Sequence, residues 1–252
     1  MRRKRRPWLA TVVLLLSCDE VAWRQPPSMG SLNVGALYQA MQQCVSARTP
    51  AQCSQAQPAC SAADRAISAF AASYQLEQIT DRLLTNWARC EDAVGRYASA
   101  ELHYRRLLRL RQYRYGPEHT EVAINLNNLA ITLEHQGKLG EAEVLHRTAL
   151  ALQERLLGPE HPEVATSLNN LATVLVEAGR PSDAEAYLHR ALAVVQKRLG
   201  PENPALATTL NNLAVVLESQ GSLGQAETLH RKALALRAKW LGPEHPDIEQ
   251  SL

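Results

Sequence analysis

Apolar residues recur at steps of three and four through the second half of the chain. One series is Val122, Leu126, Leu129, Ala130 and Leu133, and the next is Ala142, Leu145, Ala149, Leu152 and Leu156. This spacing places each series on one face of an α-helix, with polar residues on the other face. The pattern predicts two amphipathic helices between residues 116 and 157.

The pair of helices recurs with a fixed period. Gly-Pro-Glu segments begin at residues 116, 158, 200 and 242, each 42 residues after the last. Residues 116–157 share 20 identities with residues 158–199 and 25 with residues 200–241, without a gap. We therefore assign three repeats with these boundaries. Residues 242–252 begin a further unit and are expected to form a truncated C-terminal helix.

Glycine and proline mark the predicted helix ends. The first helix of each pair must end at a glycine that can enter the left-handed capping conformation, namely Gly137, Gly179 and Gly221. The next repeat's first helix can begin with proline, because no amide hydrogen bond is lost there. The residues at this place are Thr120, Pro162, Pro204 and Pro246.

A single helical hairpin cannot bury both of its apolar faces, so each repeat needs a neighbour. The sequence therefore predicts an all-α superhelical solenoid of stacked antiparallel helix pairs. Because the chain stops within a repeat, the last pair is poorly covered. We expect either self-association through the C-terminal end or a truncated reading frame.

The pattern weakens upstream but keeps its register. Asn86, Gly95 and Ala100 match repeat positions and predict a degenerate repeat over residues 78–115. Residues 32–77 are expected to form a helical cap, or an eroded repeat with a cysteine-containing insertion. One helix of this cap would contain Leu37, Met41, Cys44 and Val45, and another would contain Ile67, Phe70 and Tyr74.

Alanines recur where the paired helices would approach most closely: Ala130, Ala142, Ala149, Ala172, Ala184, Ala191, Ala214, Ala226 and Ala233. With LNNLA, EAE, AL and LGPEHP motifs at a period of 42, the chain resembles the tetratricopeptide repeat family. More narrowly, it resembles the kinesin light chain class of these repeats. The resemblance implies a right-handed superhelical solenoid whose first helices line a concave, protein-binding groove.

Two consecutive asparagines lie in the middle of each first helix, although asparagine is a poor helix former. In tetratricopeptide proteins the second of these positions commonly grips a peptide's backbone or carboxylate, since an amide both donates and accepts. The resemblance carries that role to Asn86, Asn128, Asn170 and Asn212. The alternative is an asparagine ladder that joins successive repeats without any ligand.

The predicted groove is lined by Asn86, Arg89, Asn127, Asn128, Glu134, Asn169, Asn170, Thr173, Asn211, Asn212 and Glu218. These positions are not uniformly basic, unlike a groove that selects the acidic peptides of the kinesin light chain class. We expect a ligand with apolar side chains and a positive group facing Glu134 or Glu218.

The N-terminus has the pattern of an export signal. Five basic residues at positions 2–6 precede an apolar stretch over residues 8–16, then Ser17 and Cys18. This resembles the lipobox of bacterial lipoproteins. It implies a signal peptide at 1–17, lipid on Cys18, a tether at 18–31 and a location on the periplasmic side of a bacterial membrane. An ordinary cleavable signal, or a basic cytosolic tail with a chance cysteine, is the alternative.

Export would change the charge of the chain. Removing residues 1–17 lowers Lys+Arg from 27 to 22 against 25 Asp+Glu, so the net charge falls from +2 to about −3. The basic character of the full sequence therefore argues little for nucleic acid. No apolar run reaches the roughly 18 residues that a membrane-spanning helix needs.

The cysteines after position 18 are Cys44, Cys53, Cys60 and Cys90. An even number in an exported protein predicts two disulfides, in any of three pairings, whereas a cytosolic chain would keep free thiols. Their spacing lacks the paired CxxC of a zinc site. His119, His161 and His245 recur once per repeat, so a loop or capping role is expected, with no metal or cofactor. No catalytic motif is present, and no enzymatic activity is expected.

Residues 104–115 are rich in arginine and tyrosine. They could stack on nucleic acid, contact anionic lipid or an acidic partner, or form a solvated face whose arginine stems cover apolar surface. The favoured function is a lipid-anchored, non-catalytic scaffold that binds an extended segment of another protein. The alternatives are a pilotin-like assembly factor for an envelope complex, and a cytosolic adaptor whose basic helix contacts nucleic acid.

Overall fold

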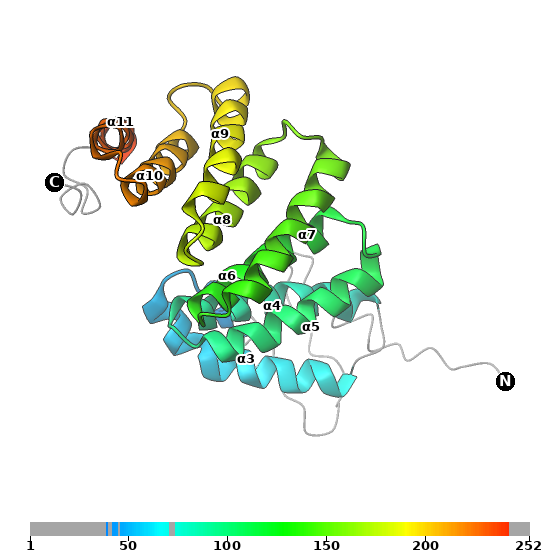
Figure 1. Ribbon diagram of the computed structural model, residues 1–252. Helices are drawn as coiled ribbons and strands as arrows, with labels where there is room; N and C mark the ends of the chain where they lie inside the picture. The colour runs from blue at the N-terminus through cyan, green and yellow to red at the C-terminus, as the bar shows by residue number, and fades with distance from the viewer. Residues whose placement is uncertain (1–38, 40–41, 45, 71–73, 242–252) are drawn as a thin grey trace. The chain divides into compact units, whose positions relative to one another are not determined.

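The computed structural model describes residues 39, 42–44, 46–70 and 74–241 (Figure 1). The predicted signal peptide, Cys18, the tether and the C-terminal residues 242–252 lie outside these ranges. The described part of the chain contains helices and no strand. The helices are α3 (Pro50–Phe70), α4 (Tyr74–Ala93), α5 (Tyr97–Tyr115), α6 (Thr120–His135), α7 (Leu139–Leu157), α8 (Pro162–Glu177), α9 (Pro181–Arg198), α10 (Pro204–Ser219) and α11 (Leu223–Leu241).

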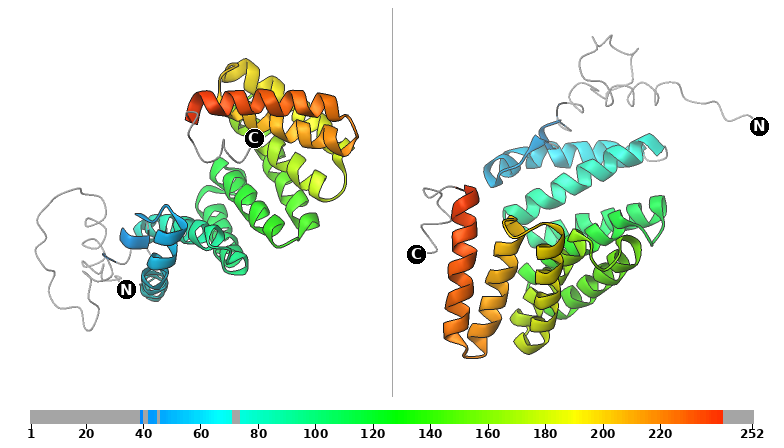
Figure 2. Two further views of the ribbon diagram at one scale, coloured as in Figure 1. Left: turned by 90° about the vertical axis from the view of Figure 1, so that its left-hand side faces the viewer. Right: turned by 90° about the horizontal axis from the view of Figure 1, so that it is seen from above.

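The chain divides into two compact units, with the boundary in the sequence between Leu110 and Arg111. In the second unit the hairpins α6–α7, α8–α9 and α10–α11 follow one another along the chain, and each hairpin packs on the next through α7 against α8 and α9 against α10. Figure 2 shows the successive pairs side by side. This arrangement confirms the predicted all-α stack of helix pairs.

The turn inside each hairpin has the predicted glycine in the left-handed conformation. Gly137, Gly179 and Gly221 have φ of 72°, 74° and 80°. At the first of these turns, Lys138 N–H donates to Leu133 O at 2.9 Å and Gly137 N–H donates to Glu134 O at 2.7 Å. The same two bonds recur in the other two hairpins. They satisfy carbonyls that the end of a helix would otherwise leave open.

The first helix of each repeat begins with a side-chain cap. Nδ1 of His119 accepts from Glu121 N–H at 3.1 Å, and Nδ1 of His161 accepts from Glu163 N–H at 3.2 Å. In the third repeat, Asn203 Oδ1 accepts from Ala205 N–H at 2.9 Å. The capping role predicted for the repeated histidines is confirmed at His119 and His161, while His245 lies outside the described residues.

In each hairpin, an ion pair joins the segment before the first helix to the last turns of the second helix. The glutamate of the Gly-Pro-Glu segment meets a basic side chain 37 residues later, at the end of the second helix. The pairs are Glu118–Arg155 at 2.8 Å, Glu160–Lys197 at 2.5 Å and Glu202–Lys239 at 2.5 Å. The hydrogen bond from Lys197 lowers the pKa of Glu160. These pairs are exposed and add little stability, but their spacing matches the repeat.

The core consists of the predicted leucines and alanines, with one difference on the second helix. The apolar series of α6 is buried throughout, and so are the nine crossing alanines. On α7, however, Leu156 is 40% exposed, whereas His146 and Gln153 are buried. The prediction was therefore wrong for Leu156. It also missed His146 and Gln153, which are buried because they have hydrogen-bond partners on α6 and α8.

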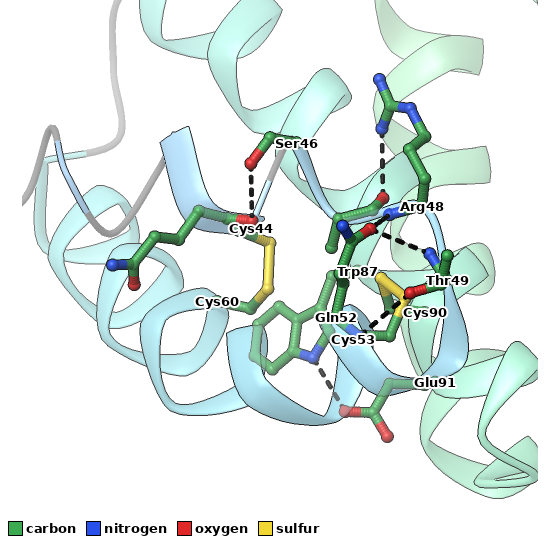
Figure 3. Close-up of a disulfide and its surroundings, with 12 residues drawn as sticks. Cys44, Ser46, Arg48, Thr49, Gln52, Cys53, Cys60, Trp87, Cys90 and Glu91 are labelled. Carbon is green, nitrogen blue, oxygen red and sulfur yellow. Dashed lines mark hydrogen bonds between the residues drawn. A yellow bond between two sulfur atoms is a disulfide. The ribbon is translucent and has the colours of Figure 1, made fainter.

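The first unit is held by two disulfides, Cys44–Cys60 and Cys53–Cys90, and the second of them joins α3 to α4 (Figure 3). The start of α3 is a capping box: Gln52 N–H donates to Thr49 Oγ1 at 3.3 Å and Thr49 N–H to Gln52 Oε1 at 3.2 Å. Tyr74, which we grouped with Ile67 and Phe70, begins the next helix instead. The predicted boundary at residue 78 therefore falls inside α4.

Candidate partner-binding surface

The first helices of the repeats line the inner side of the stack. α8 contacts α6 and α10 directly, whereas α7, α9 and α11 make no comparable contact with one another. Because the first helices lie closer together than the second helices, the stack curves with α6, α8 and α10 on its concave side. A ligand that lies along this side would cross the three first helices.

The part of α8 that reaches solvent is a single stripe. Thr166 and Glu177 are exposed, Asn170 and Thr173 are half-buried, and Val164, Leu168, Leu171 and Leu175 on the opposite side are buried. Residues one repeat away extend this stripe onto the neighbouring helices. We call the following residues the inner face: Asn128, Ile131 and His135 on α6, Asn170, Thr173 and Glu177 on α8, and Asn212, Val215 and Ser219 on α10.

The first asparagine of each pair points away from the inner face. Asn127 and Asn169 are each 7% exposed and bridge successive repeats. Asn127 Nδ2 donates to Ser167 Oγ at 2.5 Å, and Asn169 Nδ2 donates to Thr209 Oγ1 at 3.0 Å. Asn211 is half-buried, and its Oδ1 lies 3.0 Å from His230 Nδ1. We predicted all three as groove residues, but Asn127 and Asn169 are buried with partners in the stack, because consecutive helix positions differ by about 100° in direction. For Asn211 the groove role stays a prediction.

The second asparagine of each pair reaches the inner face. Asn128, Asn170 and Asn212 are half-buried, and Asn212 Nδ2 also donates to Asn169 Oδ1 at 3.3 Å. Asn86 is half-buried and Arg89 exposed in the first unit, on α4. The binding role of these residues stays a prediction, and the ladder that we considered as its alternative exists through the first asparagines.

A buried chain of polar groups passes through the first repeat. His146 is fully buried, with Nε2 at 2.7 Å from Glu134 Oε1 and Nδ1 at 2.8 Å from Asn127 Oδ1. Ser167, which accepts from Asn127, donates in turn to Gln153 Oε1. These hydrogen-bonded side chains join α6, α7 and α8. The side chain of Glu134 is only 10% exposed.

The third repeat has the same constellation, and the middle repeat lacks it. His230 Nε2 lies 3.3 Å from Glu218 Oε1, and both side chains are partly exposed. Val176 and Leu188 stand at the two equivalent positions of the middle repeat. Glu134 and Glu218 were predicted to face a positive group of the ligand, but the structure pairs both with histidines of their own repeats. The joint change from Glu and His to Val and Leu was a readable signal of this contact.

Glu177 is a charged residue of the inner face that the sequence analysis passed over. Burial raises the pKa of its carboxyl, the negative charge of Glu134 raises it further, and His135 lowers it. Thr173, which we predicted as a groove residue, is half-buried and donates from Oγ1 to Asn169 O at 3.1 Å. The inner face therefore combines amides, aliphatic side chains and one carboxyl group whose pKa is raised.

Part of the basic helix has structural partners. Arg111 is 5% exposed, and its Nη1 lies 3.1 Å from Glu121 Oε2. Arg105 bonds Glu101 at 2.8 Å, and Tyr104 is buried. Tyr113 is 82% exposed. The arginine and tyrosine pattern is thus explained in part by packing.

No group of three or more His, Cys, Asp and Glu side chains among the described residues is arranged to hold a metal ion. Within the same ranges, each helix is too short or too polar to cross a membrane.

Comparisons with known proteins agree with this geometry. The tetratricopeptide repeat family matches residues 79–145, 121–197, 181–239 and 205–252. The chain is similar to the TPR-like repeats of a Podosopora anserina protein described as a kinesin light chain, with a TM-score of 0.62 and 21% identity over 82% of this chain and 96% of that one. It is also similar to BtubC (BKLC) from P. vanneervenii, with a TM-score of 0.62 and 24% identity over 84% and 93%.

At these identities the two structures inform the fold alone, and no curated protein matches this chain. The family match spans most of the sequence, and the helix pairs, their glycine turns and their crossing alanines accord with it. The chain therefore belongs to the tetratricopeptide repeat family.

Proposed function

We propose that this protein is a non-catalytic scaffold that binds an extended segment of another protein along the inner face. The supporting observation is the row of half-buried asparagines, Asn128, Asn170 and Asn212, on three adjacent helices. Each amide offers both a donor and an acceptor to the unpaired main chain of an extended peptide. Because the stacked repeats hold the face in shape, binding requires little ordering of the scaffold.

We further propose that the scaffold is exported and attached to a bacterial membrane through Cys18. The support is the basic and apolar N-terminal sequence ending at Ser17-Cys18, together with two disulfides of the kind that persist outside the reducing cytosol. A pilotin-like assembly factor would use the same inner face and would differ only in the partner.

Site-specific crosslinking in intact cells tests the binding face. A photoreactive amino acid at Thr166, on the exposed stripe of α8, should capture a partner segment, whereas the same group at exposed Ala186 on α9 should not. The purified partner segment should then lose about tenfold or more in affinity for the Asn128→Ala/Asn170→Ala variant by calorimetry. Equal capture at both positions, or unchanged affinity, would contradict the proposal.

Cell fractionation tests the anchor independently. The wild-type chain should remain with the membrane fraction, and Cys18→Ala should be released from it. If the two forms fractionate alike, the lipid attachment is wrong, although the binding face is unaffected.

A further inference from the structure

Deepening the proposed function, we infer that the bound segment carries a lysine or arginine side chain that pairs with Glu177.

Three other glutamates near this surface are already paired. Glu134 and Glu218 meet His146 and His230, and Glu143 on α7 pairs with Arg147 and with Arg180 of the next repeat at 2.9 Å. No hydrogen bond or ion pair joins Glu177 to another side chain of the described residues. Glu177 is thus the carboxylate of the inner face that a ligand can still neutralise.

The surroundings of Glu177 make such neutralisation favourable. Although Glu177 is exposed, its pKa is raised because partial burial removes some water from the carboxylate and because Glu134 on α6 repels it, against an opposing effect of His135. A cation placed beside it would offset both effects. A second carboxylate from an acidic ligand would add to the repulsion, so the site discriminates against acidic segments.

The side chains next to Thr173 determine which residues should flank the basic residue of the ligand. Ile131 on α6 is half-buried and Val215 on α10 is 37% exposed, and they occupy equivalent places on either side of Thr173. They offer apolar contacts to residues that flank the cation. The expected ligand is therefore a basic residue between aliphatic residues in an extended segment.

The probes are blocked nine-residue peptides of aliphatic and polar residues whose central position is Lys, Arg, Gln or Glu. Their binding to the full chain is measured by fluorescence anisotropy. The Lys and Arg peptides should bind about tenfold more tightly than the Glu peptide. Glu177→Gln should remove most of this preference and Glu177→Lys should reverse it. The matched control is Glu227→Gln on α11, an exposed glutamate paired with Arg231.

The outcomes separate this inference from the proposed function. Charge-independent binding that is weakened by Asn170→Ala, or a preference that survives Glu177→Gln, would overturn the inference and leave the scaffold function intact. Absence of binding by every peptide, or binding unaffected by Asn128→Ala/Asn170→Ala, would contradict the peptide-binding face itself. Circular dichroism of each variant checks that it remains helical.

Discussion

At the scale of single residues, a network of buried polar side chains around His146 joins α6, α7 and α8. His146 is wholly enclosed, and both of its ring nitrogens lie at hydrogen-bond distance from oxygens of α6. Buried polar groups are tolerated when every member has a partner, and removing one member leaves the others unpaired. In the middle repeat, the apolar residues Val176 and Leu188 replace this Glu and His pair.

We expect His146→Leu to lower the free energy of unfolding by about 2–4 kcal/mol, because Glu134 loses its partner inside the stack. The double variant Glu134→Val/His146→Leu copies the middle repeat and should recover much of that loss. Urea denaturation of Glu134→Val, His146→Leu and the double variant measures the coupling between the two sites.

The control for this series is His189→Leu on α9, an exposed histidine 3.7 Å from Glu185. It should change stability by no more than about 0.5 kcal/mol. Additive effects of the Glu134 and His146 substitutions would show that the two side chains do not depend on each other.

The raised pKa of Glu177 should make the stability of the fold depend on pH. Its pKa is raised in the fold, so folding favours the protonated form and the charged form lowers stability above that pKa. Glu177→Gln should therefore raise the free energy of unfolding slightly at neutral pH, by about 0.5 kcal/mol or less. The gain should disappear as the pH falls through the pKa, where the wild type is itself protonated. Melting curves from pH 4 to 8 measure this difference, and a gain that grows toward low pH would contradict it.

At the scale of helices, the hairpin is set by small residues at the crossings and by glycine at the turn. Ala184 and Ala191 on α9 are fully buried, so α8 and α9 approach closely there. A larger side chain would have to displace a neighbouring backbone or adopt a strained rotamer. Local sequence accounts for these features because they lie within one repeat.

Ala184→Leu should lower the free energy of unfolding by about 1–3 kcal/mol through overpacking. Ala186→Leu is the matched control, since Ala186 is exposed on the same helix and the chemical change is identical. Thermal denaturation followed by circular dichroism compares the two variants. Equal destabilisation by both would mean that the crossing is not close at Ala184.

At the scale of the whole molecule, each of the two compact units is stabilised internally by a different kind of contact. The second unit is stabilised by contacts between successive repeats, including ion pairs such as Glu154–Arg190 at 2.5 Å. In the first unit, Trp87 stacks on His103 at 4.0 Å between ring centroids, and covalent bonds join sites 16 and 37 residues apart.

Reduction of the disulfides should loosen the first unit and spare the second. Disulfides that close loops of these sizes contribute about 3–4 kcal/mol each by restricting the unfolded chain. Hydrogen exchange with and without reductant should show faster exchange in α3 and α4 and unchanged exchange in α8. The variant Cys53→Ala/Cys90→Ala should reproduce part of the effect without reductant. An equal rise of exchange in α8 would contradict independent stabilisation of the units.

Much of the fold was predictable because its signals are local. The helix starts at Thr120, Pro162 and Pro204 and the turns at Gly137, Gly179 and Gly221 follow from the conformational limits of single residues. The number of cysteines indicated two disulfides, but their pairing depends on which segments meet in space. The capping box at Thr49 and Gln52 was readable from the chain and was overlooked.

The sequence alone determined the repeat, its helices and its small crossing residues, since periodicity and backbone preference act over a few positions. The tertiary structure decided which side chains face a ligand. Asn127 and Asn128 are neighbours with the same chemistry, yet one bonds Ser167 inside the stack and the other reaches the inner face. The direction of each depends on how one repeat lies on the next, and that packing involves residues about 40 positions apart in the chain.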